Sequence, residues 1–189
     1  MPSNMFNEKF KVFTFLLIFI GLNSTQAFAD EVRVAVASNF YPAMKEIALQ
    51  YELKKSTTSE NHKIVLIPGS SGKHYAQIIN GAPYDLFFSA DKVRPALLEK
   101  NGISDNGSRF TYALGKLILW SSLDGFVEKD ERLYDKGLRF LAIANPKISP
   151  YGEAAKEALI SINLWEGMKN NLIRGENIAQ TFQFVNSGN

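Results

Sequence analysis

The apolar residues of the chain form short runs that are separated by polar segments and turn residues. Such runs stand at residues 32–37, 63–67, 86–88, 117–120 and 140–144. Short apolar runs without a regular polar face are typical of strands that are covered on both sides. We therefore predict a strand at each of these places.

Helical patterns separate most of these runs. Apolar residues recur at helical spacing from residue 44 to residue 51, and Pro42 suits the first turn of that helix. Further helices are expected at residues 73–80, 91–98, 154–162 and 177–184. Strands that alternate with helices predict an α/β fold with a largely parallel sheet.

Three other features complete the predicted layout. Gly81 is expected to end the second helix, and Asp91 to cap the third. The charged residues 124–137 predict a solvated loop.

The first 29 residues predict a secretory signal peptide. Lys9 and Lys11 precede an apolar run at residues 12–22, which is too short to span a bilayer comfortably. Ala27-Phe28-Ala29 has the pattern of a cleavage site. We therefore expect cleavage after Ala29 and a soluble product in the periplasm.

Composition excludes several classes of function. The 189 residues include 21 Lys and Arg against 19 Asp and Glu, and no basic block stands out, which argues against a nucleic-acid-binding protein. The chain has no Cys, so disulfides, thiolate metal sites, Cys nucleophiles and a lipidated Cys are excluded.

The candidate chemistry lies where strands are followed by helices. Ser38 follows the first predicted strand, Ser70-Ser71-Gly72 follow the second, and residues 145–152 follow the last. A helix N-terminus carries partial positive charge and unpaired N–H groups. A single Ser there is usually only a cap. Several such turns converging on one cleft would bind an anion without any Arg.

Other interpretations of the same residues are weaker. Residues 69–73 lack the spacing of a phosphate-binding loop and of a nucleophile elbow. The two histidines, His62 and His74, have no metal-binding spacing. An exported Ser hydrolase would need His74 or Lys73 beside a Ser, and it stays as an alternative. We expect no enzymatic activity.

The chain resembles the periplasmic molybdate-binding proteins of molybdate ABC transporters, which are type 2 periplasmic binding proteins. The most specific piece is the string from Gly81-Ala82-Pro83 to residues 85–91, read as Asp-Leu-Phe-Phe-Ser-Ala-Asp. The other matching pieces are residues 34–38, Ser70-Ser71 with residues 76–78, residues 144–146, Pro150-Tyr151-Gly152, residues 155–159 and Glu176-Asn177-Ile178.

This resemblance implies a two-lobed α/β fold with mostly parallel sheets, which closes on a tetrahedral oxyanion in the cleft between its lobes. Residues 30–112 would form the first lobe and residues 113–189 the second. The first lobe would give the hydroxyls of Ser38 and Ser71. The second would give backbone N–H groups of Tyr151 and Ile178. Ser70 and Gly72 line the same turn as Ser71 and could assist.

The resemblance also implies the ligand and the partner. Molybdate or tungstate would be held as an oxyanion by these same residues, and no separate metal or cofactor is expected. The protein would be a monomer that delivers its ligand to an ABC-transporter permease in the inner membrane. A binding protein for another oxyanion or small solute remains an alternative.

The resemblance extends to the end of the chain, where it also marks a departure. Members of the family continue for tens of residues beyond Asn189, and that segment returns to the first lobe and carries a further ligand residue. We therefore expect a C-terminally truncated chain with an incomplete first lobe. A remnant that neither folds nor binds is a further alternative.

Overall fold

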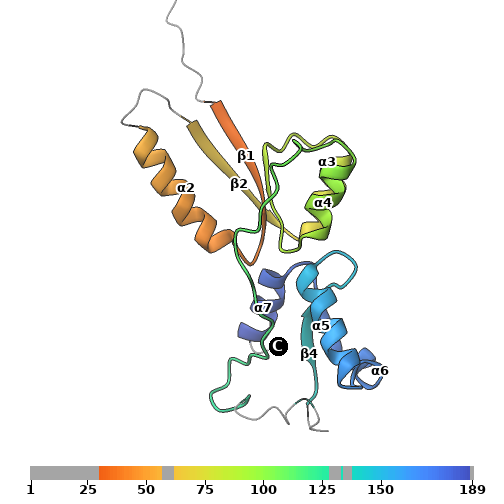
Figure 1. Cartoon of the computed structure of the whole chain (residues 1–189). Helices are drawn as coiled ribbons and strands as arrows, with labels where there is room; N and C mark the ends of the chain where they lie inside the picture. The colour runs from red at the N-terminus through yellow and green to blue at the C-terminus, as the bar shows by residue number, and fades with distance from the viewer. Residues whose placement is uncertain (1–29, 57–61, 128–132, 134–137, 188–189) are drawn as a thin grey trace, which may run out of the picture.

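The elements of the chain gather into two groups, each built on its own parallel sheet. The computed structural model describes residues 30–187, except residues 57–61, 128–132 and 134–137. Figure 1 shows one group in the upper half of the view and the other below it. We call them the three-stranded unit and the two-stranded unit. The predicted leader, residues 1–29, lies outside the described residues.

The three-stranded unit has the strand order β2-β1-β3. Its strands are β1 (Asp30–Ala37), β2 (His62–Gly69) and β3 (Leu86–Phe88). All pairs are parallel, with Ala37 beside Gly69 and Val36 beside Phe88. The carboxyl ends of the three strands therefore lie at one edge of the sheet.

Helices cover both faces of this sheet. Figure 1 shows α2 (Tyr41–Lys55) on one side, and α3 (Ser71–Ile79) and α4 (Val93–Lys100) on the other. Val34 and Val36 of β1 are buried against Met44 of α2. Burial on both faces explains why β1 carries a nearly continuous apolar run.

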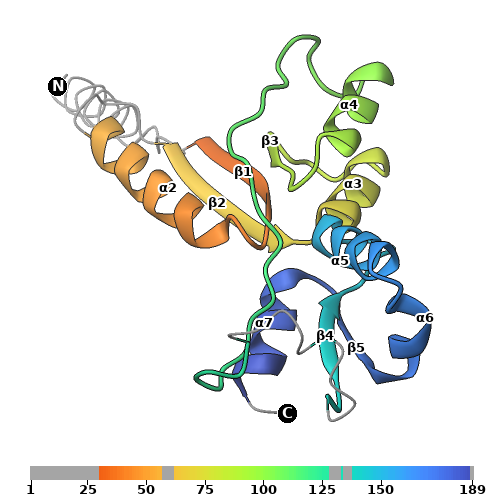
Figure 2. The same ribbon diagram turned by 60° about the horizontal axis from the view of Figure 1, so that its bottom comes forward.

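The two-stranded unit pairs β4 (Leu141–Ala144) with β5 (Leu172–Gly175), again in parallel. Four helical elements accompany them, and Figure 2 shows α5 and α7 on opposite sides of β4. These elements are α5 (Pro150–Ser161), α6 (Trp165–Met168), the 3-10 helix η2 (Lys169–Asn171) and α7 (Ile178–Asn186). The parallel pairing in both units confirms the predicted α/β class.

The strand predicted at residues 117–120 is wrong. These residues belong to an irregular stretch, residues 109–120, which we call the crossing segment because it runs from the three-stranded unit to the two-stranded unit in both views. A strand needs a neighbour to satisfy its backbone, and no strand of the described residues pairs with this one. Ile118 is 74% exposed. Trp120 stacks on Phe182 of α7, with the ring centroids 4.7 Å apart.

The remaining elements agree with the sequence or differ at their ends. Helix α5 begins four residues earlier than predicted, because Pro150 is itself suited to the first helical position. The sequence pattern missed α6 and β5. Gly81 has a φ of +84° and ends α3 as expected.

Asp91 caps α4, but it lies one residue before the N-cap position where it was expected. Lys92 occupies the N-cap position, while Asp91 Oδ1 accepts the N–H of Arg94 at 2.8 Å. Most of the predicted loop at residues 124–137 lies outside the described residues. Among the helices that the structure describes, none has the length and hydrophobicity needed to cross a membrane.

Candidate functional site

The carboxyl edges of the two sheets face each other, and three hydrogen bonds join the turns that leave them. The Ser38 N–H donates to the Gly69 carbonyl at 2.9 Å, which holds the first two turns together. The Gly72 N–H donates to the Ile148 carbonyl at 2.8 Å. The Ala179 N–H donates to Ser38 Oγ at 3.4 Å. The starts of α3, α5 and α7 therefore meet near Ser38.

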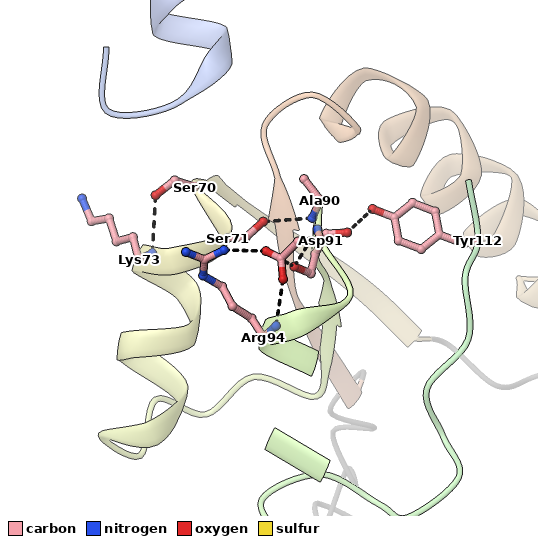
Figure 3. Close-up of polar contacts among 8 residues, drawn as sticks. Ser70, Ser71, Lys73, Ala90, Asp91, Arg94 and Tyr112 are labelled. Atoms are coloured by element: carbon pink, nitrogen blue, oxygen red, sulfur yellow. Dashed lines mark hydrogen bonds and ion pairs between the residues drawn. The ribbon is translucent and has the colours of Figure 1, made fainter. Parts of the chain in front are cut away.

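Ser71 is the most deeply placed of the predicted ligand residues. It is fully buried at the first position of α3, and its Oγ accepts the N–H of Ala90 at 2.9 Å (Figure 3). A hydroxyl has one proton and two lone pairs. With one lone pair taken by Ala90, the Ser71 hydroxyl keeps its own proton to donate to a ligand.

Ser38 has the same arrangement in a weaker form. The residue is buried directly after β1, and its Oγ accepts the N–H of Ala179 in the first turn of α7. The distance of 3.4 Å marks a long hydrogen bond. The Ser38 hydroxyl can donate its proton while it links the two units.

Ser70 and Gly72 have other partners in this structure. Ser70 is the N-cap of α3, and its side chain accepts the N–H of Lys73 at 3.4 Å. The N–H of Gly72 is used by Ile148. A Cβ at Gly72 would lie 2.6 Å from the Ile148 carbonyl oxygen, so the absence of a side chain permits this close approach.

Tyr151 stands in the first turn of α5, where a backbone donor is free. Pro150 precedes it and has no N–H, and the N-cap residue Ser149 makes no side-chain cap hydrogen bond. The Ser149 carbonyl accepts the N–H of Glu153, one turn further on. The N–H of Tyr151 therefore has no acceptor within the helix.

Ile178 is the first residue of α7 and offers a second backbone donor. The neighbouring N–H groups are occupied: that of Ala179 by Ser38, and that of Gln180 by the side chain of the N-cap residue Asn177. The Ile178 N–H is left for a ligand, because a first-turn N–H has no intrahelical acceptor.

Charged side chains beside these turns occur in pairs. Asp91 and Arg94 form a largely buried ion pair at 2.6 Å, next to the Ala90 N–H that holds Ser71 (Figure 3). Lys73 and Glu176 form an exposed pair at 3.5 Å between the two units. Pairing cancels most of the field of these four side chains, so the ligand groups proposed at the turns are neutral donors. No group of three or more acidic or histidine side chains suited to a metal occurs in the described part of the chain.

A cavity of about 340 Å³ opens beside these donors. It reaches from the turn after β1 to the first turn of α5, and the crossing segment forms one wall. Its lining includes Asn39, Ala90, Tyr112, Lys116 and Tyr151. Burial, and then the neighbouring Tyr151 and Asp91, raise the pKa of Tyr112, whose hydroxyl donates to the Ser89 carbonyl at 2.7 Å.

A second cavity, of about 220 Å³, lies on the other side of α3. Ser70, Lys73, Glu176 and Asn177 line it. Two of the predicted ligand residues therefore fall on the two cavities, Tyr151 on the larger and Ser70 on the smaller. The other four predicted ligand residues line neither cavity: Ser38, Ser71, Gly72 and Ile178.

A comparison with known families identifies the family of this chain. The family of bacterial extracellular solute-binding proteins matches residues 32–189. The chain belongs to this family.

Relatives of this solute-binding protein include two that are named for molybdate. The molybdate-binding protein ModA of Azotobacter vinelandii is 47% identical over 170 residues, which cover 89% of this chain and 66% of that protein. ModA of Rhodobacter capsulatus is 38% identical over 176 residues, covering 93% of this chain and 68% of that protein. The chain thus spans about two thirds of the length of these relatives.

A solved structure of a molybdate-binding protein also matches this chain. The periplasmic molybdate-binding protein of Azotobacter vinelandii matches with a TM-score of 0.76 at 39% identity, over 83% of this chain and 67% of that one. The predicted fold family is therefore confirmed.

The alternative of a Ser hydrolase finds no support in this solute-binding protein. His74 Nδ1 contacts Gln77 at 3.3 Å, and His74 Nε2 is a buried atom without a hydrogen-bond partner in the structure. Burial lowers the pKa of His74. Neither ring nitrogen of His74 is hydrogen-bonded to a serine among the described residues, so His74 forms no Ser–His pair of the kind that activates a nucleophile.

Sequence reasoning missed the residues that arrange the donors. The Ala90 N–H orients Ser71, and Arg94 neutralises the adjacent Asp91. Ala90 lies within the string at residues 85–91 that carried the family resemblance, and Arg94 follows it three residues later. That string was the available signal. Nothing in the local pattern showed that α3 would touch Ile148.

Proposed function

We propose that this protein binds molybdate or tungstate between its two units and delivers it to an ABC-transporter permease in the inner membrane. Two hydrogen bonds between the units support the proposal, because they bring together the turns that carry the proposed donors: Gly72 to Ile148 and Ala179 to Ser38. The proposed donors are the hydroxyls of Ser38 and Ser71 and the N–H groups of Tyr151 and Ile178. The names of its relatives support the choice of ligand.

Donors without acceptors suit a fully deprotonated dianion. Every oxygen of molybdate accepts hydrogen bonds, so all four ligand groups can donate to it at once. A protonated phosphate also has a hydroxyl that must donate, and the proposed site offers that proton no acceptor. This difference favours molybdate over phosphate.

Sulfate has the same shape and charge as molybdate, so size must separate them. Metal–oxygen bonds are longer than sulfur–oxygen bonds, and donors set for the larger ion would make long, weak bonds to the smaller one. The tight contacts around the donors support this account. The carbonyl of Ile148 holds Gly72, and the N–H of Ala90 holds Ser71, so neither can follow a smaller ligand inward.

The two units would act as the lobes of a closing cleft. We assign residues 30–112 to the first lobe and residues 113–189 to the second. The bonds from Gly72 to Ile148 and from Ala179 to Ser38 join them in this conformation. A ligand that touches both lobes binds the closed form more tightly and shifts the population toward it. The closed form is then what the permease would recognise.

We place the working protein in the periplasm, as a monomer with no cofactor. The predicted signal peptide at residues 1–29, with cleavage after Ala29, would take it there. The matching structure is that of a periplasmic protein.

Titration calorimetry on the exported chain tests this function. We expect molybdate and tungstate to bind with one ion per chain, and sulfate to bind at least about a hundredfold more weakly because its shorter bonds leave the donors out of reach. Phosphate should give no heat of binding. Sulfate binding as tight as that of molybdate would disprove the size selection, and absence of binding by all four ions would disprove the proposed function.

A further inference from the structure

The main chains of the two units touch at Gly72, the second residue of α3. Its N–H donates to the Ile148 carbonyl at 2.8 Å, and Figure 2 shows α3 beside α5 at this place. Ile148 belongs to the turn between β4 and α5. The contact therefore joins the neighbour of Ser71 to the turn that leads to Tyr151.

Residue 72 has no room for a side chain. A Cβ built on Gly72 would lie 2.6 Å from the carbonyl oxygen of Ile148, 2.9 Å from its Cα and 3.0 Å from its carbonyl carbon. All three are main-chain atoms, so no side-chain rotation relieves the contact. Since an ordinary contact begins at about 3.4 Å, the main chain of Ile148 would have to retreat by about 0.8 Å.

Ile148 is fixed to its own unit and cannot retreat alone. The N–H groups of Ile148 and Ser149 both donate to the Asn145 carbonyl, at 3.2 and 2.9 Å. The Asn145 N–H in turn donates to the carbonyl of Gly175 in β5 at 2.7 Å. A retreat of Ile148 therefore carries the start of α5 with it, and Tyr151 lies in that first turn.

Gly72 is fixed in the same way on the other side of the contact. The Ser70 carbonyl accepts the N–H of His74 at 3.1 Å in the first turn of α3. The neighbouring Ser71 is buried, and its Oγ accepts the N–H of Ala90 at 2.9 Å. Because both sides of the contact are held, an added methyl group is accommodated only when the two units move apart.

We propose that Gly72 is a positioning residue for the oxyanion site: its lack of a side chain sets how closely the two units approach. The contact with Ile148 then fixes the spacing between the Ser71 hydroxyl and the Tyr151 N–H. This inference deepens the proposed function and rests on it for the effect on ligand binding. Any side chain at residue 72 holds the units apart, and their donors no longer reach one ion at hydrogen-bond length.

The substitution Gly72→Ala tests the effect on binding. We expect titration calorimetry to show molybdate affinity about tenfold lower or weaker still, because donors on the two units cannot both keep their hydrogen-bond length. Alanine favours a helix more than glycine does, so the change does not itself weaken α3. Gly167→Ala is the matched control in α6, where a Cβ meets nothing within 4 Å, and it should bind as the natural chain does.

A distance measured without ligand separates this inference from the proposed function. The chain has no Cys, so Lys100→Cys in α4 and Glu157→Cys in α5, both at exposed positions, can each carry one spin label. Helix α4 lies on the same face of its sheet as α3 (Figure 1). We expect pulsed electron paramagnetic resonance to give a longer distance between the labels when Gly72→Ala is added, and the same distance when Gly167→Ala is added.

Three results would overturn the inference. The first is an unchanged label distance in the Gly72→Ala chain, which would place any loss of affinity within α3. The second is a longer distance with the molybdate affinity of the natural chain. The third is a loss of cooperative unfolding in urea, because units that only move apart keep their sheets. If the natural chain binds no molybdate, the proposed function fails, and the label distance still judges the role of Gly72.

Discussion

The two sides of the proposed site supply the same kind of hydrogen bond by different means. The three-stranded unit uses side chains, Ser38 and Ser71, whose oxygen atoms already accept an N–H from the protein. The two-stranded unit uses the backbone at the starts of α5 and α7. Its donors depend on where the helices lie and not on which side chains they carry.

This difference determines which kind of substitution removes a hydrogen-bond donor on each side of the proposed site. A hydroxyl is lost by replacing one residue, whereas a backbone N–H is lost only by moving the chain. The position of α5 is set by a close contact, because a Cβ on Gly152 would clash with the carbonyl oxygen of Ala144. We therefore expect side-chain chemistry to dominate on one side and packing on the other.

The largest effect should come from Gly152→Ala, which breaks the packing of the backbone side. Backbone atoms of Ala144 and Asn145 cannot swing away from the added methyl group. We expect a loss of about 2–3 kcal/mol in the free energy of unfolding, measured in urea. Gly167→Ala lies in α6 with nothing nearby and should stabilise the chain by up to about 1 kcal/mol. Equal stability of the Gly152→Ala and natural chains would contradict the packing argument.

The next effect concerns the side-chain half of the comparison. Ser71→Ala removes a buried donor and should weaken molybdate binding by about 1.5–3 kcal/mol, as for a hydrogen bond to a charged group. Ser38→Ala should cost less, because its bond to Ala179 is long.

Ser70→Ala is the matched control for these two serines. It removes the N-cap of α3, so the free energy of unfolding should fall by about 1 kcal/mol while the affinity changes by less than about threefold. Calorimetry on the three variants distinguishes a ligand from a cap. If Ser71→Ala and Ser70→Ala both bind molybdate as tightly as the natural chain, both serines act only as caps.

A smaller effect is expected from pH, through His74. Burial lowers its pKa in the folded chain, so the unfolded chain binds a proton at a pH where the folded chain does not. Stability is then fully present above about pH 6.5 and falls as the pH drops below it, by at most about 1.4 kcal/mol per pH unit.

Urea unfolding at several pH values measures this dependence. His74→Gln should flatten the curve below about pH 6.5. An unchanged slope in His74→Gln would show that other groups cause the acid sensitivity.

The smallest effect should come from Ile178→Val on the backbone side. This change keeps the N–H at the start of α7 and removes only one methylene group. We expect molybdate affinity to change by less than about twofold, with calorimetry as the measurement. A loss as large as that of Ser71→Ala would mean that the two sides do not differ in the way described.

Much of the fold was predictable because local pattern and tertiary structure agree. Strand β1 is apolar and buried from Val34 to Ala37, and Gly81 ends α3 with a positive φ. That the turns at Ser38 and Ser71 are neighbours was predictable in the same way, since they follow strands that pair directly. These features depend on a few neighbouring residues.

The failures share a different cause. The apolar pattern of residues 117–120 predicted a strand. A run of apolar residues indicates only that these side chains favour a packing partner. Whether the run pairs with another strand depends on other parts of the chain. β5 was missed because its four residues gain their strand form from Ala144 and its neighbours in β4.

The sequence by itself determined the alternation of strands and helices, the free N–H groups at the helix starts and the hydroxyls beside them. These follow from periodicity and backbone chemistry over a few residues. Only the tertiary structure decided that Ala179 would reach Ser38, that Ala90 would hold Ser71 and that Gly72 would reach Ile148. Such contacts join residues far apart in the chain, so they depend on how the sheets and helices pack, which no local pattern records.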